Sequence, residues 1–209
     1  NTPVSNNIIL SFKNHINNIG IFAIKLVQWS NYRLKTTIDN KHLHKFLDKM
    51  TIYYENCENH NFKYTEQTYQ DDFNMILIDN YTLEHNPIAS GSIGQVYKGT
   101  DNNNNNIAIK CVHPNIYNKI TIPKMLLSLF NNYLTCLPCL KKYKLPIDLN
   151  GFFYSLEQQI NLKYEAENIQ KMYLLYENNP YIIIPKHLYS SKKMLIMSYE
   201  EGISFSKAK

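Results

Sequence analysis

The sequence predicts an α+β fold, in which an antiparallel sheet of about five strands carries a long helix and follows a helical extension. Apolar residues recur at intervals of three and four over residues 16–33, which is the period of an amphipathic helix. From residue 87 onwards, short apolar runs alternate with turn residues, as in strands joined by hairpins. We therefore expect a helical extension over residues 1–86 and an α+β lobe over residues 87–206, with an inserted helix over residues 114–145.

The composition narrows the classes of partner. The chain has 209 residues and a formal net charge of +5, and its lysines are scattered along the sequence. A nucleic-acid partner is not expected, because nucleic-acid-binding domains concentrate their basic residues on one face. The mild basic excess suits an anionic ligand or a membrane surface, and it is equally compatible with an ordinary solvated surface.

The cysteines and the apolar runs predict neither a metal site nor a membrane span. The chain has 4 cysteines. Cys136 and Cys139 form a lone CxxC pair and lack the second pair that a zinc site needs. The most apolar run, residues 120–140, is interrupted by Lys124 and Pro138 and is too polar to cross a bilayer.

The first helix of the extension carries two polar residues on a shared face. Lys25 and Gln28 are three residues apart on the helix over residues 16–33, so their side chains are neighbours. Taken alone, this pattern is also that of a solvated helix face.

Two further helices are expected before the first strand. One covers residues 41–54, where leucine and phenylalanine recur at helical spacing. The other covers residues 66–77, and Thr65 is a suitable N-cap for it because a threonine hydroxyl can accept from the free N–H groups of the first turn.

A glycine-rich turn between two short strands is the most informative stretch. Residues 87–99 have the pattern of a strand, a tight turn with Gly91 and Gly94, and a second strand. Glycine has no Cβ, so the backbone N–H groups of such a turn can approach a polyphosphate closely. The alternative is an ordinary hairpin, in which Ser90, Gly91 and Ser92 only turn the chain.

A strand that carries a lysine follows this turn. Residues 102–106 are an asparagine run that we expect to form a turn, and residues 107–110 are an apolar strand that ends in Lys110. A lysine at this place can supply a fixed positive charge to the phosphates of a nucleotide. This order of elements has the logic of a protein-kinase N-lobe.

The segment after the lysine strand is expected to be helical. His113 ends the strand, and Pro114 can occupy the start of a helix. Residues 116–143 follow with a helical pattern that is broken near Pro123 and stops near Pro138.

One long helix is expected after Pro146. Its apolar stripe begins at Phe152 and continues to Met172. Glu165 lies on this helix, and a carboxylate there can pair with Lys110 and hold it for contact with phosphates, as the lysine–glutamate pair of kinases does.

Two strands and a turn complete the expected lobe. Residues 181–185 and 193–199 are apolar runs of strand length. The polar turn over residues 200–202 would form the hinge behind an adenine ring.

Taken together, these motifs resemble the UbiB/AarF/ADCK atypical kinase-like family, which is associated with coenzyme Q biosynthesis. Each motif alone is weakly specific, but their joint order is specific, and the resemblance covers roughly residues 10–206. The segments that resemble family motifs are residues 25–29 (its KxGQ helix), 87–96 (its alanine-rich nucleotide loop), 107–110 with 113–114 (its lysine strand), 165–168 (the start of its helix C), and 185 with 197–202 (its later strands and hinge).

The resemblance implies an ATP site, with Mg²⁺ as the accompanying ion. Lys110 would contact the phosphates and Glu165 would orient Lys110, so these two are the predicted catalytic residues. The predicted nucleotide-binding residues are Ile88, Ala89, Ser90, Gly91, Ser92, Ile93, Gly94, Gln95, Val96, Lys110, Met197, Ser198, Tyr199 and Glu200.

For the full-length protein, the resemblance implies an atypical kinase or ATPase whose phosphoryl transfer or ATP hydrolysis is linked to lipid or quinone metabolism. HxD and DFG motifs are absent from the sequence, so the catalytic base, the magnesium ligands and the C-lobe are expected outside this chain. The alternative is a non-catalytic pseudokinase scaffold or a module that binds a lipid or a protein partner. Members of the family are intracellular and often organellar or membrane-associated.

The sequence departs from the family in the extension helix and in the motif that faces it. Val27 replaces the glycine of KxGQ, and the two carboxylates of the family's ExD motif fall on Gln159 and Asn161. A buried lysine without an anionic partner is costly, so Lys25 must reach solvent or another acceptor. Lys25, Gln28, Gln159 and Asn161 are the predicted regulatory positions, and we expect ATP binding to be retained while the family's self-restraint is relaxed.

Overall fold

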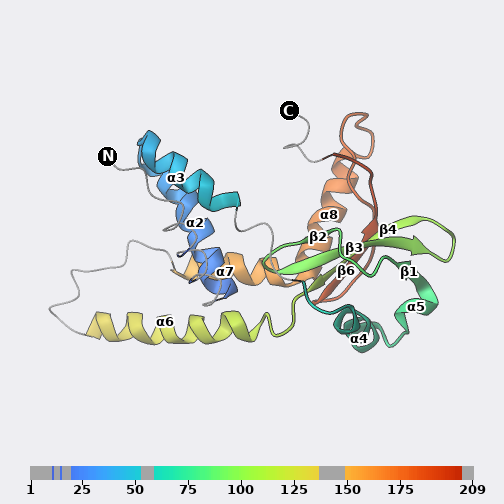
Figure 1. The fold of residues 1–209 in the computed structure, drawn as a ribbon, viewed down its shortest axis with the longest axis horizontal. Coiled ribbons are helices and arrows are strands. Elements are labelled where there is room, and N and C mark those ends of the chain that lie inside the picture. Colours follow the sequence, from blue (N-terminus) through green and yellow to red (C-terminus); the bar gives the residue numbers. More distant parts are fainter. Residues whose placement is uncertain (1–10, 12–14, 16–19, 53–58, 137–148, 204–209) are drawn as a thin grey trace. The chain divides into compact units, whose positions relative to one another are not determined.

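In a computed structural model, the chain consists of helices and one antiparallel sheet (Figure 1). The structure describes residues 11, 15, 20–52, 59–136 and 149–203. The predicted α+β class is confirmed, and the sheet has six strands where about five were expected. No helix within the described residues is long and apolar enough to cross a membrane.

Two compact units make up the chain, and they differ from the predicted division at residues 86 and 87. Residues 58–86 pack with the sheet, because the helices and the strand that they form contribute to its core. The helical unit contains residues 1–57, 91–93 and 115–157. The sheet unit contains residues 58–90, 94–114 and 158–209.

The helical unit is held together by aromatic and aliphatic contacts between its helices. Phe22 stacks on Phe153 with 5.7 Å between ring centroids, and Trp29 meets Phe152 edge-on at 5.8 Å. Such aromatic pairs add to the burial of apolar surface. Its elements are α2 (Ile21–Thr37), α3 (Lys41–Ile52), α6 (Asn118–Cys136) and α7 (Leu149–Ile160), the last three residues of α7 belonging to the sheet unit.

The predicted break near Pro123 is wrong, because α6 continues through this residue. Proline removes one backbone donor from a helix, and this cost is local. Ile120 is buried one turn earlier, so packing of the helix offsets the lost hydrogen bond.

The sheet unit contains the sheet and the helices that pack on it, and neighbouring strands of the sheet run antiparallel. The strand order is β1-β3-β4-β6-β5, and β2 pairs with β3 outside this path. The elements are α4 (Phe62–Phe73), α5 (Leu77–Asn80), β1 (Tyr81–Leu83), β2 (Ala89–Ser90), β3 (Gly94–Asp101), β4 (Asn106–Val112), α8 (Leu162–Tyr176), β5 (His187–Ser190) and β6 (Met194–Ser198).

One face of the sheet forms a hydrophobic core with α4 and α5. Successive residues of a strand point to opposite faces, so every second residue of β4 and β6 enters this core. Burial of each large apolar side chain contributes about 1.5–3 kcal/mol. The buried members of the cluster are Tyr69, Leu77, Tyr81, Ile107, Ile109, Cys111, Met194 and Ile196.

Helix α4 begins earlier than predicted. Its N-cap is Asn61, whose side chain accepts a hydrogen bond from the backbone N–H of Lys63 at 2.9 Å. The predicted cap, Thr65, lies inside the helix and is fully buried. Asparagine and threonine are both good caps, so the tertiary burial of Thr65 decided between them.

The single long helix predicted after Pro146 is two helices. α7 ends at Ile160, and α8 begins at Leu162. Between them, Asn161 has an extended backbone (φ −99°, ψ 99°), and its side chain accepts from the N–H of Lys163 at 3.2 Å. An asparagine that caps the second helix therefore starts a new element where the apolar stripe alone suggested continuity.

The strand predicted over residues 181–185 is wrong, whereas the strand predicted over residues 193–199 corresponds to β6 (Met194–Ser198). The strand that pairs with β6 is β5, which begins two residues after Pro185. Proline cannot donate to a sheet ladder. Tyr181 is 92% exposed and Ile183 is 73% exposed, so this apolar run is outside the core.

Candidate functional site

Four residues from four neighbouring strands form one row on the face of the sheet that is opposite the α4 core. The register pairs Ala89 with Val96, Val96 with Lys110, and Lys110 with Leu195. Directly paired residues of antiparallel strands lie on the same face. The row therefore brings together three of the predicted nucleotide-binding residues, with Lys110 in the middle of the sheet.

Lys110 forms an ion pair with both carboxylate oxygens of Glu165 in α8. Its Nζ donates to Oε1 at 2.8 Å and to Oε2 at 2.7 Å. The two side chains are 24% and 35% exposed, so solvent reaches the pair and an anion can approach the ammonium. This contact was expected from the sequence, whereas the catalytic role of both residues stays a prediction.

Helix α8 is fixed against the sheet at the turn that carries Glu165. Leu162 and Ala166 are buried, and the backbone N–H of Leu162 donates to the carbonyl of Lys192 at 3.0 Å. Glu165 is adjacent to Ala166 and follows Leu162 by one turn of helix. Packing of α8 therefore determines where the carboxylate meets Lys110.

A second row continues the same face toward the end of β6. Lys98 pairs with Ala108, and Ala108 pairs with Met197. The ammonium of Lys98 lies 4.4 Å from the centroid of the Tyr199 ring and 3.8 Å from the carboxylate of Glu201. A cation above an aromatic face is attracted to it, so Lys98 links β3 to the segment that follows β6.

The predicted hinge residues are hydrogen-bonded to neighbouring segments. The hydroxyl of Ser198 accepts from the N–H of Lys186 at 2.8 Å and donates to the carboxylate of Glu200 at 2.6 Å. The N–H of Tyr199 donates to the carbonyl of Asn106 at 3.1 Å. These contacts hold the backbone after β6 in one direction, as recognition through backbone groups requires.

Two of the predicted nucleotide-binding residues point their side chains to the opposite face, and their role in nucleotide binding stays a prediction. Ser90 pairs with Gln95, and Gln95 pairs with Cys111 of the core. Gln95 is fully buried, and Ser90 Oγ is enclosed with no hydrogen-bond partner among the described residues. Strand alternation is the physical reason, and it leaves only the backbone of these two residues for a ligand.

Gly94 is required by the pairing of β3 with β4. A side chain at this position would run into the carbonyl oxygen of Cys111. Next to this turn, the N–H of Ile88 donates to the carbonyl of Val96 at 2.8 Å. The remaining predicted loop residues, 91–93, belong to the helical unit.

A buried polar cluster on the core side of β3 contains residues that the sequence patterns did not predict. Gln95 Oε1 accepts from the N–H of His60 at 2.9 Å, and Gln95 Nε2 donates to the carbonyl of His60 at 3.1 Å. The ring of His60 places Nδ1 2.9 Å from Nδ1 of His113 and Nε2 2.9 Å from Oγ1 of Thr65. Side chains alternate between the two faces of the strand over residues 94–101. This alternation is the sequence signal that could have predicted that Gln95 and Tyr97 face the core.

His60, Tyr97 and Cys111 are neutral at pH 7. Burial, together with the neighbouring His113, lowers the pKa of His60 to about 4. Burial raises the pKa of Tyr97 and raises that of the Cys111 thiol to about 12. A thiol reacts as the thiolate, so Cys111 is not a nucleophile here.

The four predicted regulatory residues are divided between the two units. Lys25 and Gln28 are half-buried on α2 of the helical unit, and Val27 packs against a cluster of Ala23 and Ile24. Of the two positions of the ExD motif, both in the sheet unit, Gln159 is exposed and Asn161 is the cap of α8. The regulatory role of these positions stays a prediction.

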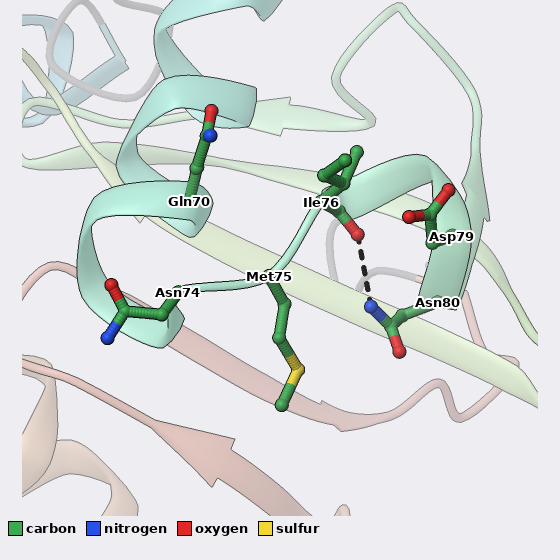
Figure 2. Close-up of a pocket in the computed structure, with 6 residues that line it drawn as sticks. All are labelled: Gln70, Asn74, Met75, Ile76, Asp79 and Asn80. Atoms are coloured by element: carbon green, nitrogen blue, oxygen red, sulfur yellow. Dashed lines mark hydrogen bonds between the residues drawn. The ribbon is translucent and has the colours of Figure 1, made fainter.

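An open cavity of about 490 Å³ at the end of α4 contains none of the predicted site residues. Asp79 is its one ionisable side chain, so it offers no set of catalytic groups. Within the part of the chain that the structure describes, no group of three His, Cys, Asp or Glu residues could hold a metal ion. Figure 2 shows the residues that line the cavity, which are Gln70, Asn74, Met75, Ile76, Asp79 and Asn80.

Comparison with protein families gives a match over most of the chain. A model described as the ABC1 atypical kinase-like domain matches residues 53–209. This range contains the whole sheet, α8 and the ion pair between Lys110 and Glu165.

Several curated proteins resemble the chain over most of its length. A probable serine/threonine-protein kinase abkC of Dictyostelium discoideum is 27% identical over 88% of this chain and 26% of its own length. The ABC1 family protein C21C3.03, mitochondrial, of Schizosaccharomyces pombe is 26% identical over 90% of this chain and 31% of its own length. The ABC1 family protein YPL109C, mitochondrial, of Saccharomyces cerevisiae is 26% identical over 88% and 30%. The chain thus spans about 26–31% of the length of these relatives.

A solved structure has a similar fold. It is the complex of Rv3197 with erythromycin from Mycobacterium tuberculosis, with a TM-score of 0.59 and 16% sequence identity. The match covers 83% of this chain and 44% of that chain. At this identity the match concerns the fold alone.

Proposed function

Because the chain belongs to the ABC1 atypical kinase-like family, we propose that it forms the ATP-binding part of an atypical kinase or ATPase. The family resemblance predicted from the sequence is confirmed, and the fold is that of a kinase-like N-lobe with a helical extension. Phosphoryl transfer or ATP hydrolysis, linked to lipid or quinone metabolism, belongs to the full-length protein in this proposal.

The ion pair between Lys110 and Glu165 is the observation that carries the proposal. A lysine in the middle of a sheet is expensive to desolvate unless an acid holds it. Here the acid comes from a separate helix and contacts the ammonium with both of its oxygens. Kinases use such a pair to present a lysine to the α and β phosphates of ATP.

The residues around this pair fit a nucleotide. Ala89 and Ala108 have small side chains on the same face as Lys110, and Val96 and Met197 offer apolar side chains for the face of a base. Lys110 supplies positive charge between Val96 and Leu195 in the same row. Bound Mg²⁺ would neutralise phosphate charge, and we propose that its ligands come from residues outside this chain.

The direct test is nucleotide binding by the full-length protein and its Lys110→Ala variant. We expect ATP to raise the melting temperature of the wild type in the presence or absence of Mg²⁺. Lys110→Ala should weaken ATP binding about tenfold or more, because it removes a charge-assisted contact to phosphate, and it should abolish turnover.

Lys35→Ala is a matched control, since Lys35 also forms an ion pair, with Asp48, but within the helical unit. It should bind ATP like the wild type. No thermal shift of the wild type by ATP, or unchanged ATPase activity of Lys110→Ala, would refute the proposed function.

A non-catalytic pseudokinase is the second candidate, and the amides at the ExD positions favour it. Asn161 is engaged as the cap of α8 and carries no charge with which to hold Lys25. A full-length protein that binds ATP through Lys110 but neither hydrolyses it nor transfers its phosphate would support this candidate.

A further inference from the structure

Gln95 is the centre of a buried hydrogen-bonded connection between three segments that border the proposed nucleotide site. It follows Gly94 at the start of β3, directly after the glycine-rich turn. His60 lies just before α4, and His113 lies just after β4, three residues beyond Lys110. These three segments are far apart in the sequence, and the sheet unit contains all of them.

The contact between Gln95 and His60 is a closed pair of hydrogen bonds. The amide oxygen of Gln95 accepts from the backbone N–H of His60 at 2.9 Å, and its amide nitrogen donates to the backbone carbonyl of the same residue at 3.1 Å. The nitrogen also contacts the hydroxyl of Tyr97. Gln95 has no exposed surface, so water cannot replace these bonds when the side chain moves.

The ring of His60 extends this connection to β4 and α4. Its Nδ1 lies 2.9 Å from Nδ1 of His113, and its Nε2 lies 2.9 Å from Oγ1 of Thr65. Thr65 Oγ1 in turn lies 3.2 Å from the hydroxyl of Tyr97. The start of β3 is therefore connected to the end of the lysine strand by side chains as well as by the ladder.

This connection lies at the phosphate end of the proposed site. Gln95 pairs with Cys111, the residue next to Lys110, whereas Ala108 and Met197 pair two residues before Lys110 in β4, on the face that carries Lys110. Movement at Gln95 would change the position of Gly94 relative to Lys110 more than it would change the surface for a base.

We propose that Gln95 is a positioning residue, which fixes the backbone of Gly94, at the start of β3, relative to Lys110 through its two hydrogen bonds to His60. In this role its side chain touches no part of the nucleotide and acts on the phosphates through the backbone of Gly94. The inference rests on the proposed nucleotide-binding function. It explains why the polar side chain of Gln95 is buried on the face away from the ligand.

The test compares the affinity of the full-length protein for ATP with its affinity for adenosine. Their ratio measures how much the phosphates contribute to binding. Gln95→Met keeps the length of the side chain and removes both hydrogen bonds to His60. We expect this variant to lower the ratio about tenfold or more, since small misplacements of a binding group have large effects, and to leave adenosine binding nearly unchanged.

Two threonines of α4 provide a milder variant and its control. Thr65→Val removes a hydroxyl of the cluster, so it should lower the ratio by about threefold. Thr68 is also buried, but its hydroxyl donates to the carbonyl of Tyr64 at 2.7 Å and is outside the contacts that join Gln95 to His113. Thr68→Val should reduce the melting temperature without changing the ratio, which separates positioning from a general loss of stability.

The possible failures are distinct. If the wild type does not bind ATP, the proposed function is wrong. If the wild type binds ATP more tightly than adenosine and the folded Gln95→Met variant keeps the same ratio, the positioning role alone is wrong. If Gln95→Met does not fold, an unchanged ratio in Thr65→Val overturns the inference, and a lowered ratio supports it.

Discussion

Lys110 Nζ contacts both carboxylate oxygens of Glu165, at 2.8 Å and 2.7 Å, although the two residues are 55 positions apart in the sequence. One comes from the central strand β4 and the other from α8. The pair exists because α8 packs on the sheet through Leu162 and Ala166, which bracket the glutamate. This ion pair connects the fold to the proposed chemistry, and the first prediction concerns its removal.

Glu165→Gln should weaken ATP binding by about three- to tenfold, because the neutral amide holds the ammonium of Lys110 less firmly. The free energy of unfolding should change by less than about 1 kcal/mol, since solvent screens this partly exposed pair. Isothermal titration calorimetry and chemical unfolding measure the two quantities. Glu157→Gln is the matched control, because Glu157 pairs with Lys124 in the helical unit. Equal ATP affinity in the two variants would contradict the orienting role.

Stability should fall in acid because the partial burial of His60 favours its neutral form. The pKa of this residue is lowered from 6.5 to about 4, so between these values the unfolded chain binds more protons than the folded one. The free energy of unfolding therefore decreases as the pH falls from 6.5 toward 4. The loss across this window should be about 1–2 kcal/mol, after solvent screening of the half-buried ring is allowed for.

Urea unfolding at pH 7 and at several values down to pH 4.5 measures this loss. His60→Gln cannot titrate, so its stability should depend less steeply on pH than that of the wild type. The contribution of the histidines away from His60 cancels in the comparison, whereas the contact with His113 is removed together with His60. The same steepness in both proteins would show that His60 is not the group responsible.

Gly94→Ala should destabilise the fold by about 1–3 kcal/mol, which is typical of overpacking against atoms that cannot move. The added Cβ would meet the carbonyl oxygen of Cys111, which is part of the β3–β4 ladder. A Cβ at Gly202 would meet nothing within 4 Å, so Gly202→Ala is the control and should change stability by less than about 0.5 kcal/mol. Thermal unfolding of both variants tests the expectation, and it fails if Gly94→Ala melts with the wild type.

Asn161→Ala should destabilise the protein by about 1 kcal/mol, because it removes the side chain that caps α8. Asn161→Asp restores the carboxylate of the family motif and keeps an acceptor for the N–H of Lys163. It should be at least as stable as the wild type, since a negative charge is favourable at the start of a helix. Thermal melting orders the three proteins, and equal stability of the alanine variant and the wild type would exclude the capping role.

Much of the candidate site could be predicted from the sequence, because its signals are local. The glycine-rich turn, the lysine at the end of an apolar strand and the glutamate on a helix each appear in a few consecutive residues. Their order along the chain was sufficient to identify the family, and the structure places Lys110 against Glu165.

Other features were not accessible, because they depend on partners that are distant in the sequence. The run over residues 181–185 is as apolar as a strand, but the segment that pairs with β6 is β5. The apolar stripe from Phe152 to Met172 is continuous, but Asn161 caps a new helix within it.

The sequence alone therefore determined the class of fold, the family and the residue types of the site. The tertiary structure decided which face each side chain occupies. Gln95 lies within the loop motif, yet its pairing with Cys111 turns the side chain into the core and onto His60. The physical reason is that strand alternation divides neighbouring residues between two faces, and the packing of α4 on one of them determines which residues join the core on that side.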